Sequence, residues 1–242
     1  MPTVQLFVTC LVDTFYPQVG EAIADILSRL GMTVDFAADQ TCCGQPQFNA
    51  GLRADARQVA EHTIRVFEAA PGEIVSPSGS CVHMMRVNYP ELFAEDAAWL
   101  ARAESLAKRT FEFSEYIVDH LGVTDVGAHW NGRLTYHSSC HLLRGLGVDR
   151  QPRALLAAVQ GAEVVELPHT DECCGFGGIF SVTHPEVSKE MLANKNANLE
   201  KSESPTLVVP DAGCLMHIAG GLHRQGKSQR AVHLAEVLAN RE

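Results

Sequence analysis

Short apolar runs alternate with longer stretches of helical periodicity along the first half of the chain. Three runs rich in β-branched and apolar residues predict buried strands at residues 4–9, 33–36 and 73–76. Between them, apolar positions spaced three and four residues apart predict helices over residues 17–30, which Gly31 ends, and over residues 51–67. Strands that alternate with helices are typical of βαβ units, so we expect an α/β fold with a parallel sheet.

The second half repeats this pattern. Strands are predicted at residues 134–136, 163–167 and 206–209, and helices near residues 153–159 and 185–201. Residues 97–122 read as one or two connecting helices, and residues 129–132 as a turn. We therefore predict two pseudo-symmetric βαβ halves, residues 1–125 with the connecting helices and residues 126–242, packed as one compact body.

The eight cysteines follow the same repeat. They are Cys10, Cys42, Cys43, Cys81, Cys140, Cys173, Cys174 and Cys214. Each of the last four stands 130 to 133 residues after its counterpart in the first four, and an adjacent pair followed by glycine occurs in both halves. Internal repeats of this kind organise a chain, and chance does not explain four matched positions with their neighbours.

Every predicted strand in each half is followed by at least one of these cysteines. The carboxyl ends of parallel strands meet at one edge of a sheet, so we expect the four cysteines of each half to converge there, in loops after the strands. Helix amino termini open on the same edge and favour thiolates or an anionic cluster. Gly44 and Gly175 are expected to let the backbone turn sharply beside the site, where a Cβ atom would clash.

Composition and charge narrow the possible functions. The chain has 242 residues, 46% of them hydrophobic, with a formal net charge of −10 and a pI of about 5.5, so nucleic acid is not an expected partner. The sequence contains no run of about eighteen apolar residues, so we predict no membrane-spanning helix. We see no secretory signal and expect a cytoplasmic protein, in which cysteines bind metal or carry out redox chemistry more often than they form disulfides.

Four readings of the cysteines remain open from the residues alone: iron–sulfur clusters, structural zinc, buried structural cysteines and disulfides. Adjacent cysteines pair awkwardly in a disulfide and strain the tetrahedral geometry of a single zinc ion. They suit a cluster with several irons, which favours iron–sulfur ligation. Three histidines lie near the second set, and each is a candidate metal ligand or proton carrier as well as a candidate structural residue: His137, His141 and His217.

The chain resembles the cysteine-rich CCG domain family of iron–sulfur oxidoreductases. Members include subunits of heterodisulfide reductase, of glycolate oxidase and of a three-protein L-lactate dehydrogenase complex. The matching stretches are residues 7–10, 42–46, 76–81, 173–178 and 233–238. In the heterodisulfide reductase branch each repeat ends in C-x2-C, whereas here Ser78 and Asp211 stand three residues before Cys81 and Cys214, so each half has four cysteines rather than five. Each of the two residues could supply an oxygen ligand, shape the turn or accept N–H bonds there.

The resemblance implies a cofactor, partners and a reaction. Each half would hold one iron–sulfur cluster, of 4Fe–4S type, through its four cysteines, with zinc as a substitute metal. The chain would transfer electrons in a complex that oxidises L-lactate to pyruvate, together with a ferredoxin-like iron–sulfur subunit and a third small subunit, and would not be catalytic alone. The alternatives are a thiol–disulfide reductase subunit of the heterodisulfide type and a zinc-stabilised scaffold.

Overall fold

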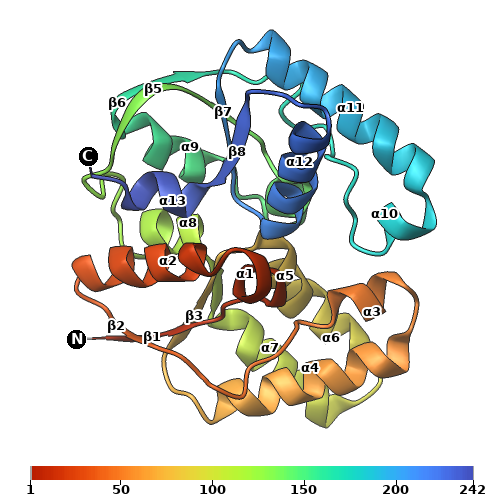
Figure 1. Cartoon of the computed structure of the whole chain (residues 1–242). Helices are drawn as coiled ribbons and strands as arrows, with labels where there is room; N and C mark the ends of the chain where they lie inside the picture. Colours follow the sequence, from red (N-terminus) through yellow and green to blue (C-terminus); the bar gives the residue numbers. More distant parts are fainter. Residues whose placement is uncertain (1, 242) are drawn as a thin grey trace. The chain divides into compact units, whose positions relative to one another are not determined.

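The computed structural model describes residues 2–241, which divide into two compact units, residues 2–116 and residues 117–241 (Figure 1). Each unit contains one four-stranded sheet in which every strand pairs in parallel with its neighbours. The predicted α/β class with two parallel βαβ halves is therefore confirmed. The pattern was sufficient because both sheets are built from short apolar strands separated by amphipathic helices.

The first unit has the strand order β2-β1-β3-β4. Its strands are β1 (Thr3–Leu6), β2 (Thr33–Asp35), β3 (Glu73–Ser76) and β4 (Thr110–Glu112). Its helices are α1 (Cys10–Phe15), α2 (Pro17–Arg29), α3 (Gln45–Asn49), α4 (Arg53–Glu68), α5 (Gly79–His83), the π-helical η1 (Met84–Asn88), α6 (Tyr89–Leu92), α7 (Ala97–Lys108) and α8 (Phe113–Glu115). A second π-helical segment, η2 (Tyr116–His120), begins at the last residue of this unit.

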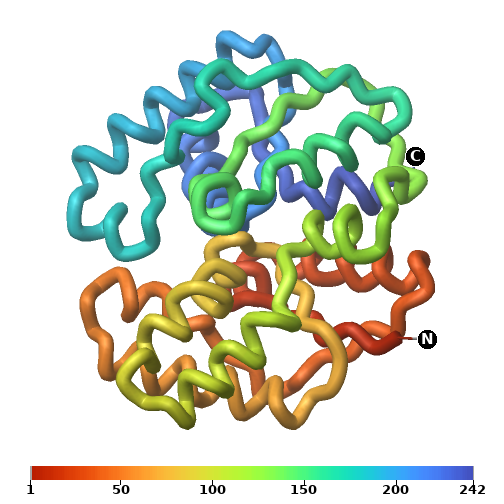
Figure 2. The backbone as a smooth tube through the Cα atoms, turned by 180° about the vertical axis from the view of Figure 1, so that it is seen from behind, coloured from red at the N-terminus to blue at the C-terminus, as the bar shows by residue number. Residues whose placement is uncertain are grey.

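The second unit has the equivalent order β6-β5-β7-β8. Its strands are β5 (His129–Tyr136), β6 (Gln160–Val165), β7 (Thr206–Val209) and β8 (Arg230–His233). Its helices are the π-helical η3 (His141–Leu146), α9 (Arg150–Ala157), α10 (Phe180–Thr183), α11 (Pro185–Lys201), α12 (Ala212–Arg224) and α13 (Leu234–Ala239). Within this unit α9 packs beside α13, and α11 beside α12, and the two helix pairs lie on opposite sides of the sheet (Figures 1 and 2).

Two details of the sequence prediction were wrong. A fourth strand, β4 or β8, completes each sheet, whereas three strands were predicted; residues 97–122 accordingly hold β4 as well as helices. The expected turn at residues 129–132 is the beginning of β5, where a shift in register between His129 and Gly132 marks a bulge. The Asn131-Gly132 pair that suggested a turn lies in this irregular stretch, where the strand needs a glycine with positive φ.

The strand order determines where a ligand can bind. In each sheet the first strand of the unit lies between the second and the third. The connection after the first strand runs to one side of it and the next connection crosses to the other side, so the strand order reverses between β1 and β3 and between β5 and β7. In open α/β sheets, ligands bind outside the carboxyl ends of the strands at such a switch point. The core of the first unit reaches that edge, because Cys43 and Cys81 pack in the same buried cluster as Phe7, Phe67 and Ile74.

Candidate metal centres

The cysteines of the first unit meet at the carboxyl edge of its sheet. Cys10 is the first residue of α1, which follows β1, and Cys81 lies in the first turn of α5, after β3. Cys42 and Cys43 lie in the loop between β2 and α3. The Sγ atoms of Cys10 and Cys42 are 3.7 Å apart, and those of Cys43 and Cys81 are 3.3 Å apart. Cys10 and Cys81 thus lie in first helical turns, not in the expected loops.

The cysteines of the second unit lie at the corresponding places. Cys140 immediately precedes η3, and Cys173 and Cys174 lie in the loop after β6. Cys214 lies in the first turn of α12, so it too lies in a helix and not in the expected loop. The Sγ atoms of Cys174 and Cys214 are 3.3 Å apart, the same distance as in the corresponding pair of the first unit. In both units the second cysteine of the adjacent pair and the last cysteine are buried.

The first three cysteines of each unit influence each other's ionisation in the same way in both units. Hydrogen bonds from Cys10 and then Cys43 lower the pKa of Cys42 to about 3. The equivalent bonds from Cys140 and Cys174 lower the pKa of Cys173 to about 2. Because they donate those bonds, Cys10, Cys43, Cys140 and Cys174 have raised pKa values, and burial raises them further. The first cysteine of each adjacent pair is therefore the thiol that ionises first.

Glycine after each adjacent pair shapes the loop around the sulfurs. Gly44 and Gly175 have φ values of 84° and 89°, in the region that other residues adopt at a cost. Their N–H groups point at the sulfurs of Cys42 and Cys173, at 3.5 and 3.4 Å. A Cβ atom on Gly175 would lie 2.7 Å from the carbonyl oxygen of Ser188 in α11, so the clash is with the following helix.

The residues that replace a fifth cysteine begin the helices that carry the last cysteine. Asp211 caps α12, and its carboxylate accepts hydrogen bonds from the N–H groups of Gly213 at 3.0 Å and Cys214 at 3.4 Å. Ser78 occupies the equivalent position before α5, and its carbonyl oxygen accepts the N–H of Cys81 at 3.1 Å. Asp211 was expected to supply an oxygen ligand, shape the turn or accept N–H bonds, and in the structure it accepts N–H bonds.

The three candidate histidines of the second unit lie in different surroundings. A ring nitrogen of His137 and the Sγ atoms of Cys174 and Cys214 all lie within 4.8 Å of one another. The Nδ1 atom of His141 is 3.9 Å from the Sγ atom of Cys140. His217 faces Ser188 in α11, with 3.3 Å between Nε2 and the hydroxyl oxygen, and burial lowers its pKa.

The donor set of each unit fits a thiolate-bound metal or cluster. Two thiolates on one tetrahedral metal lie about 3.8 Å apart, given metal–sulfur bonds of about 2.3 Å. The observed separations of 3.3 to 3.7 Å are close to that value, so small movements of the side chains would admit a metal ion. A cluster of several irons would need the sulfurs to spread further. A single metal ion and a cluster both displace the thiol protons when they bind. The hydrogen bonds that Cys42 and Cys173 accept assist this loss of protons, because they lower the pKa of both thiols.

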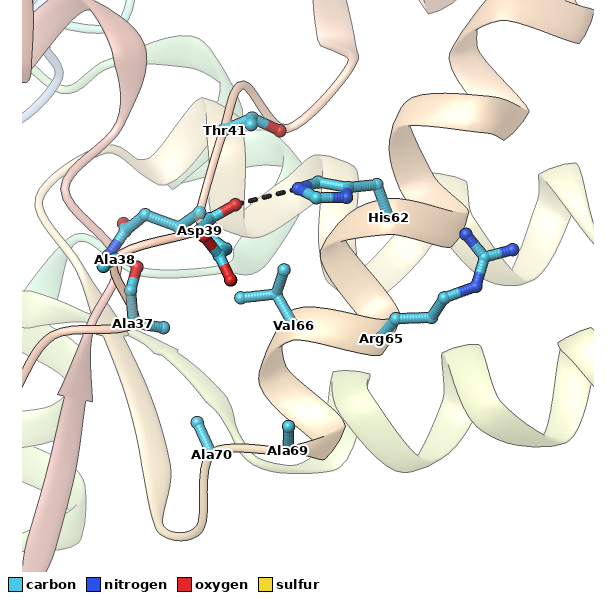
Figure 3. A pocket seen from close by; sticks show the side chains of 10 residues that line it. Ala37, Ala38, Asp39, Thr41, His62, Arg65, Val66, Ala69 and Ala70 are labelled. Atoms are coloured by element: carbon cyan, nitrogen blue, oxygen red, sulfur yellow. Dashed lines mark hydrogen bonds between the residues drawn. The ribbon is translucent and has the colours of Figure 1, made fainter.

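Two hollows lie beside the loop that carries Cys42. One, of about 230 Å³, is lined by Cys10 and Cys42 together with Phe36 and Asp13, and it gives solvent access to the exposed Cys10. The other is larger, about 740 Å³, and lies between that loop and α4 (Figure 3). No cysteine lines the larger hollow; His62 of α4 contacts the carbonyl oxygen of Asp39 across it at 2.8 Å (Figure 3).

Comparison with known proteins agrees with this architecture. The chain belongs to the CCG family of cysteine-rich domains, whose family model matches residues 4–86 and again residues 134–219. The two matches contain the two sets of cysteines, so the repeat seen in the sequence is a duplication of this domain.

Relatives of similar length are close in sequence. The chain is 49% identical to lactate utilization protein A of an Exiguobacterium species over 239 residues, which is 98% of this chain and 97% of that protein. It is 48% identical to lactate utilization protein A of Bacillus velezensis over 238 residues, 98% of this chain and 99% of that protein. Among solved structures, a hypothetical protein from Helicobacter pylori has the same fold, with a TM-score of 0.64 at 9% identity; the match covers 98% of this chain and 48% of that one.

Proposed function

We propose that the chain is an iron–sulfur electron-transfer subunit of a cytoplasmic complex that oxidises L-lactate to pyruvate. Each unit would hold one cluster, of 4Fe–4S type, through its four cysteines. The observation that carries the proposal is the pair of matching thiol sets, each at the switch point of a parallel sheet. Family membership and the name of the relatives support the choice of lactate as the substrate of the complex.

The chain's own residues supply what such a centre needs. A bound cluster would accept and release one electron at a time. The thiols of Cys43 and Cys174 are buried, with 2% and 1% of their surface exposed, so the protein excludes water from one side of each site. The N–H groups of Gly44 and Gly175 donate to sulfur and so offset negative charge there. Cys10 remains exposed, which leaves the first site accessible to a redox partner.

Oxidation of lactate itself requires other proteins under this proposal. Removal of two electrons with cleavage of a C–H bond normally uses a flavin or nicotinamide, and the Gly-rich stretch at residues 175–178 lacks the full dinucleotide-binding pattern. A ferredoxin-like iron–sulfur subunit and a third small subunit are the partners we propose. No helix between residues 2 and 241 is both long and apolar enough to cross a membrane.

The proposal is tested by anaerobic production of the chain, followed by iron and acid-labile sulfide analysis and electron paramagnetic resonance (EPR). We expect a brown protein with iron and sulfide at both sites. A colourless protein that holds only zinc after anaerobic handling would contradict the electron-transfer role and support a scaffold. Lactate-dependent dye reduction should then occur only when the partner subunits are added. Sustained turnover by the loaded chain alone would place the catalytic site in this chain.

A further inference from the structure

The two candidate centres differ at one equivalent position. Phe7 and His137 each stand three residues before the first cysteine of their set. The N–H of Phe7 donates to the carbonyl oxygen of Val75 in β3, and the N–H of His137 donates to that of Val208 in β7. Both side chains are fully buried. The first centre therefore has an apolar ring, packed edge-on against Phe67, where the second centre has an imidazole.

The hydrogen bonds of His137 determine which ring nitrogen is free. Its Nδ1 atom lies 3.3 Å from the carbonyl oxygen of Thr170, which can only accept. The same oxygen lies 3.4 Å from the ammonium group of Lys195, another donor. Nδ1 consequently carries the hydrogen, and in the neutral ring Nε2 carries a lone pair. Nε2 is buried and no oxygen or nitrogen atom partners it; it faces the sulfur of Cys214, whose pKa is lowered by a hydrogen bond from Cys174 and further by one from His137.

We propose that Nε2 of His137 is a metal ligand of the second centre, beside Cys174 and Cys214, and that it takes the place of one of the two other cysteines of that set, so that the centre keeps four protein ligands. A ring nitrogen of His137 already lies within 4.8 Å of both sulfurs. Histidines that bind metals commonly donate their other ring N–H to a backbone carbonyl, which fixes the tautomer and the ring orientation, and Thr170 supplies that carbonyl. The second centre is thus a mixed thiolate and imidazole site, and the first is a thiolate site. This inference rests on the proposed metal-binding function.

Histidine nitrogen bound to iron is detected by pulsed EPR on protein labelled with [15N]histidine. The sample is the full chain with Cys43→Ala, so that only the second centre is loaded. We expect a nitrogen hyperfine coupling that changes with the label and is lost in His137→Phe, which copies the residue of the first unit. His141→Phe is the matched control, because His141 also lies near a cysteine of the set, and the coupling should persist.

The outcomes separate this inference from the proposed function. A loaded second centre without histidine coupling, or with coupling that His141→Phe removes and His137→Phe does not, overturns the inference while leaving the cluster in place. If His137→Phe fails to fold, His137→Gln retains a donor to Thr170 and should likewise lose the coupling.

A chain that binds no iron at either site contradicts the proposed function, and the ligand is then decided on the zinc-loaded chain by X-ray absorption. A nitrogen shell at about 2.0–2.1 Å, distinct from sulfur at about 2.3 Å, should be present and should vanish in His137→Phe. Its absence, or its persistence in that variant, overturns the assignment of His137.

Discussion

Glu112 and His233 occupy equivalent positions in the two units, each at the end of the outer strand that follows the last cysteine helix. Both begin a short helix with a capping box: Glu112 with Glu115 at the start of α8, and His233 with Glu236 at the start of α13. Both side chains are buried, with 1% of their surface exposed. The duplicated fold has therefore retained the cap while exchanging a carboxyl group for an imidazole.

The Glu112 cap should make stability depend on pH. Burial raises the pKa of Glu112 from 4.5 to about 7, against the lowering effect of the hydrogen bonds from Ser114 and Glu115. The folded state then binds a proton more tightly than the unfolded state, so the carboxyl group's contribution to stability falls as pH rises from about 4.5 to about 7. The total loss is about 3–4 kcal/mol, at about 1.4 kcal/mol per pKa unit.

Glu112→Gln should therefore flatten the stability profile between pH 4.5 and 7, measured by urea unfolding at equal metal loading. Glu104→Gln, an exposed carboxyl on α7, is the control and should follow the unsubstituted chain. Parallel profiles for Glu112→Gln and the unsubstituted chain across this range would show that the buried carboxyl does not titrate there.

Gly175→Ala should destabilise the second unit more than Gly178→Ala does. Both glycines have positive φ, at 89° and 63°, which costs a residue with a Cβ atom about 1–2 kcal/mol. The added Cβ at Gly175 also meets the Ser188 carbonyl oxygen at 2.7 Å, whereas nothing lies within 4 Å at Gly178. Overpacking of that kind costs about 1–3 kcal/mol more. Equal losses in denaturant unfolding would show that the loop relaxes away from α11.

The sheet class and the grouping of cysteines at strand ends could be predicted from the sequence because both follow from local patterns. Apolar runs, helical spacing and the duplicated cysteines are all visible along the chain. The outer strands were missed because β4 (Thr-Phe-Glu) and β8 (Arg-Ala-Val-His) are short, are largely polar and lie beside helices. Periodicity cannot distinguish so short a run from a helix end.

The setting of His137 could not be predicted, because three distant segments create it. In the sequence, His137 of the second repeat corresponds to Phe7 of the first, so the repeat itself gave no reason to expect a metal ligand at this position. Only the folded chain brings the Thr170 carbonyl and Cys214 to the same ring. Phe7 and His137 make equivalent backbone hydrogen bonds, so the mismatch between the repeats is a difference between the two sites.

Loss of one ligand should empty one site. Cys43→Ala is expected to remove the metal of the first unit, and Cys174→Ala that of the second, because each cysteine pairs with the last cysteine of its own unit at 3.3 Å. Each variant should therefore retain about half the metal and sulfide of the unsubstituted chain. Complete loss from both sites in a variant that still unfolds cooperatively would show that the sites depend on each other.

Lys195 should raise the reduction potential of the second site. It lies on α11 with no exposed surface, and its ammonium group donates to the carbonyl oxygens of His169 at 2.8 Å and Thr170 at 3.4 Å. Burial lowers its pKa, while negative groups including Glu172, Cys174 and Cys214 act in the opposite direction. A buried positive charge near the sulfurs favours the reduced, more negative state of a bound cluster, because charge is poorly screened there.

Lys195→Met keeps the length and apolar stem of the side chain and removes the charge. We expect the second site to become harder to reduce and the first site to keep its potential, in an EPR-monitored redox titration. Lys201→Met is the control, since Lys201 lies on the same helix but is exposed, and it should change neither potential. An unchanged second-site potential in Lys195→Met would show that the hydrogen-bonded carbonyls already cancel the charge. A potential that falls equally in both variants would instead indicate a general effect of net charge, which screening by salt would abolish.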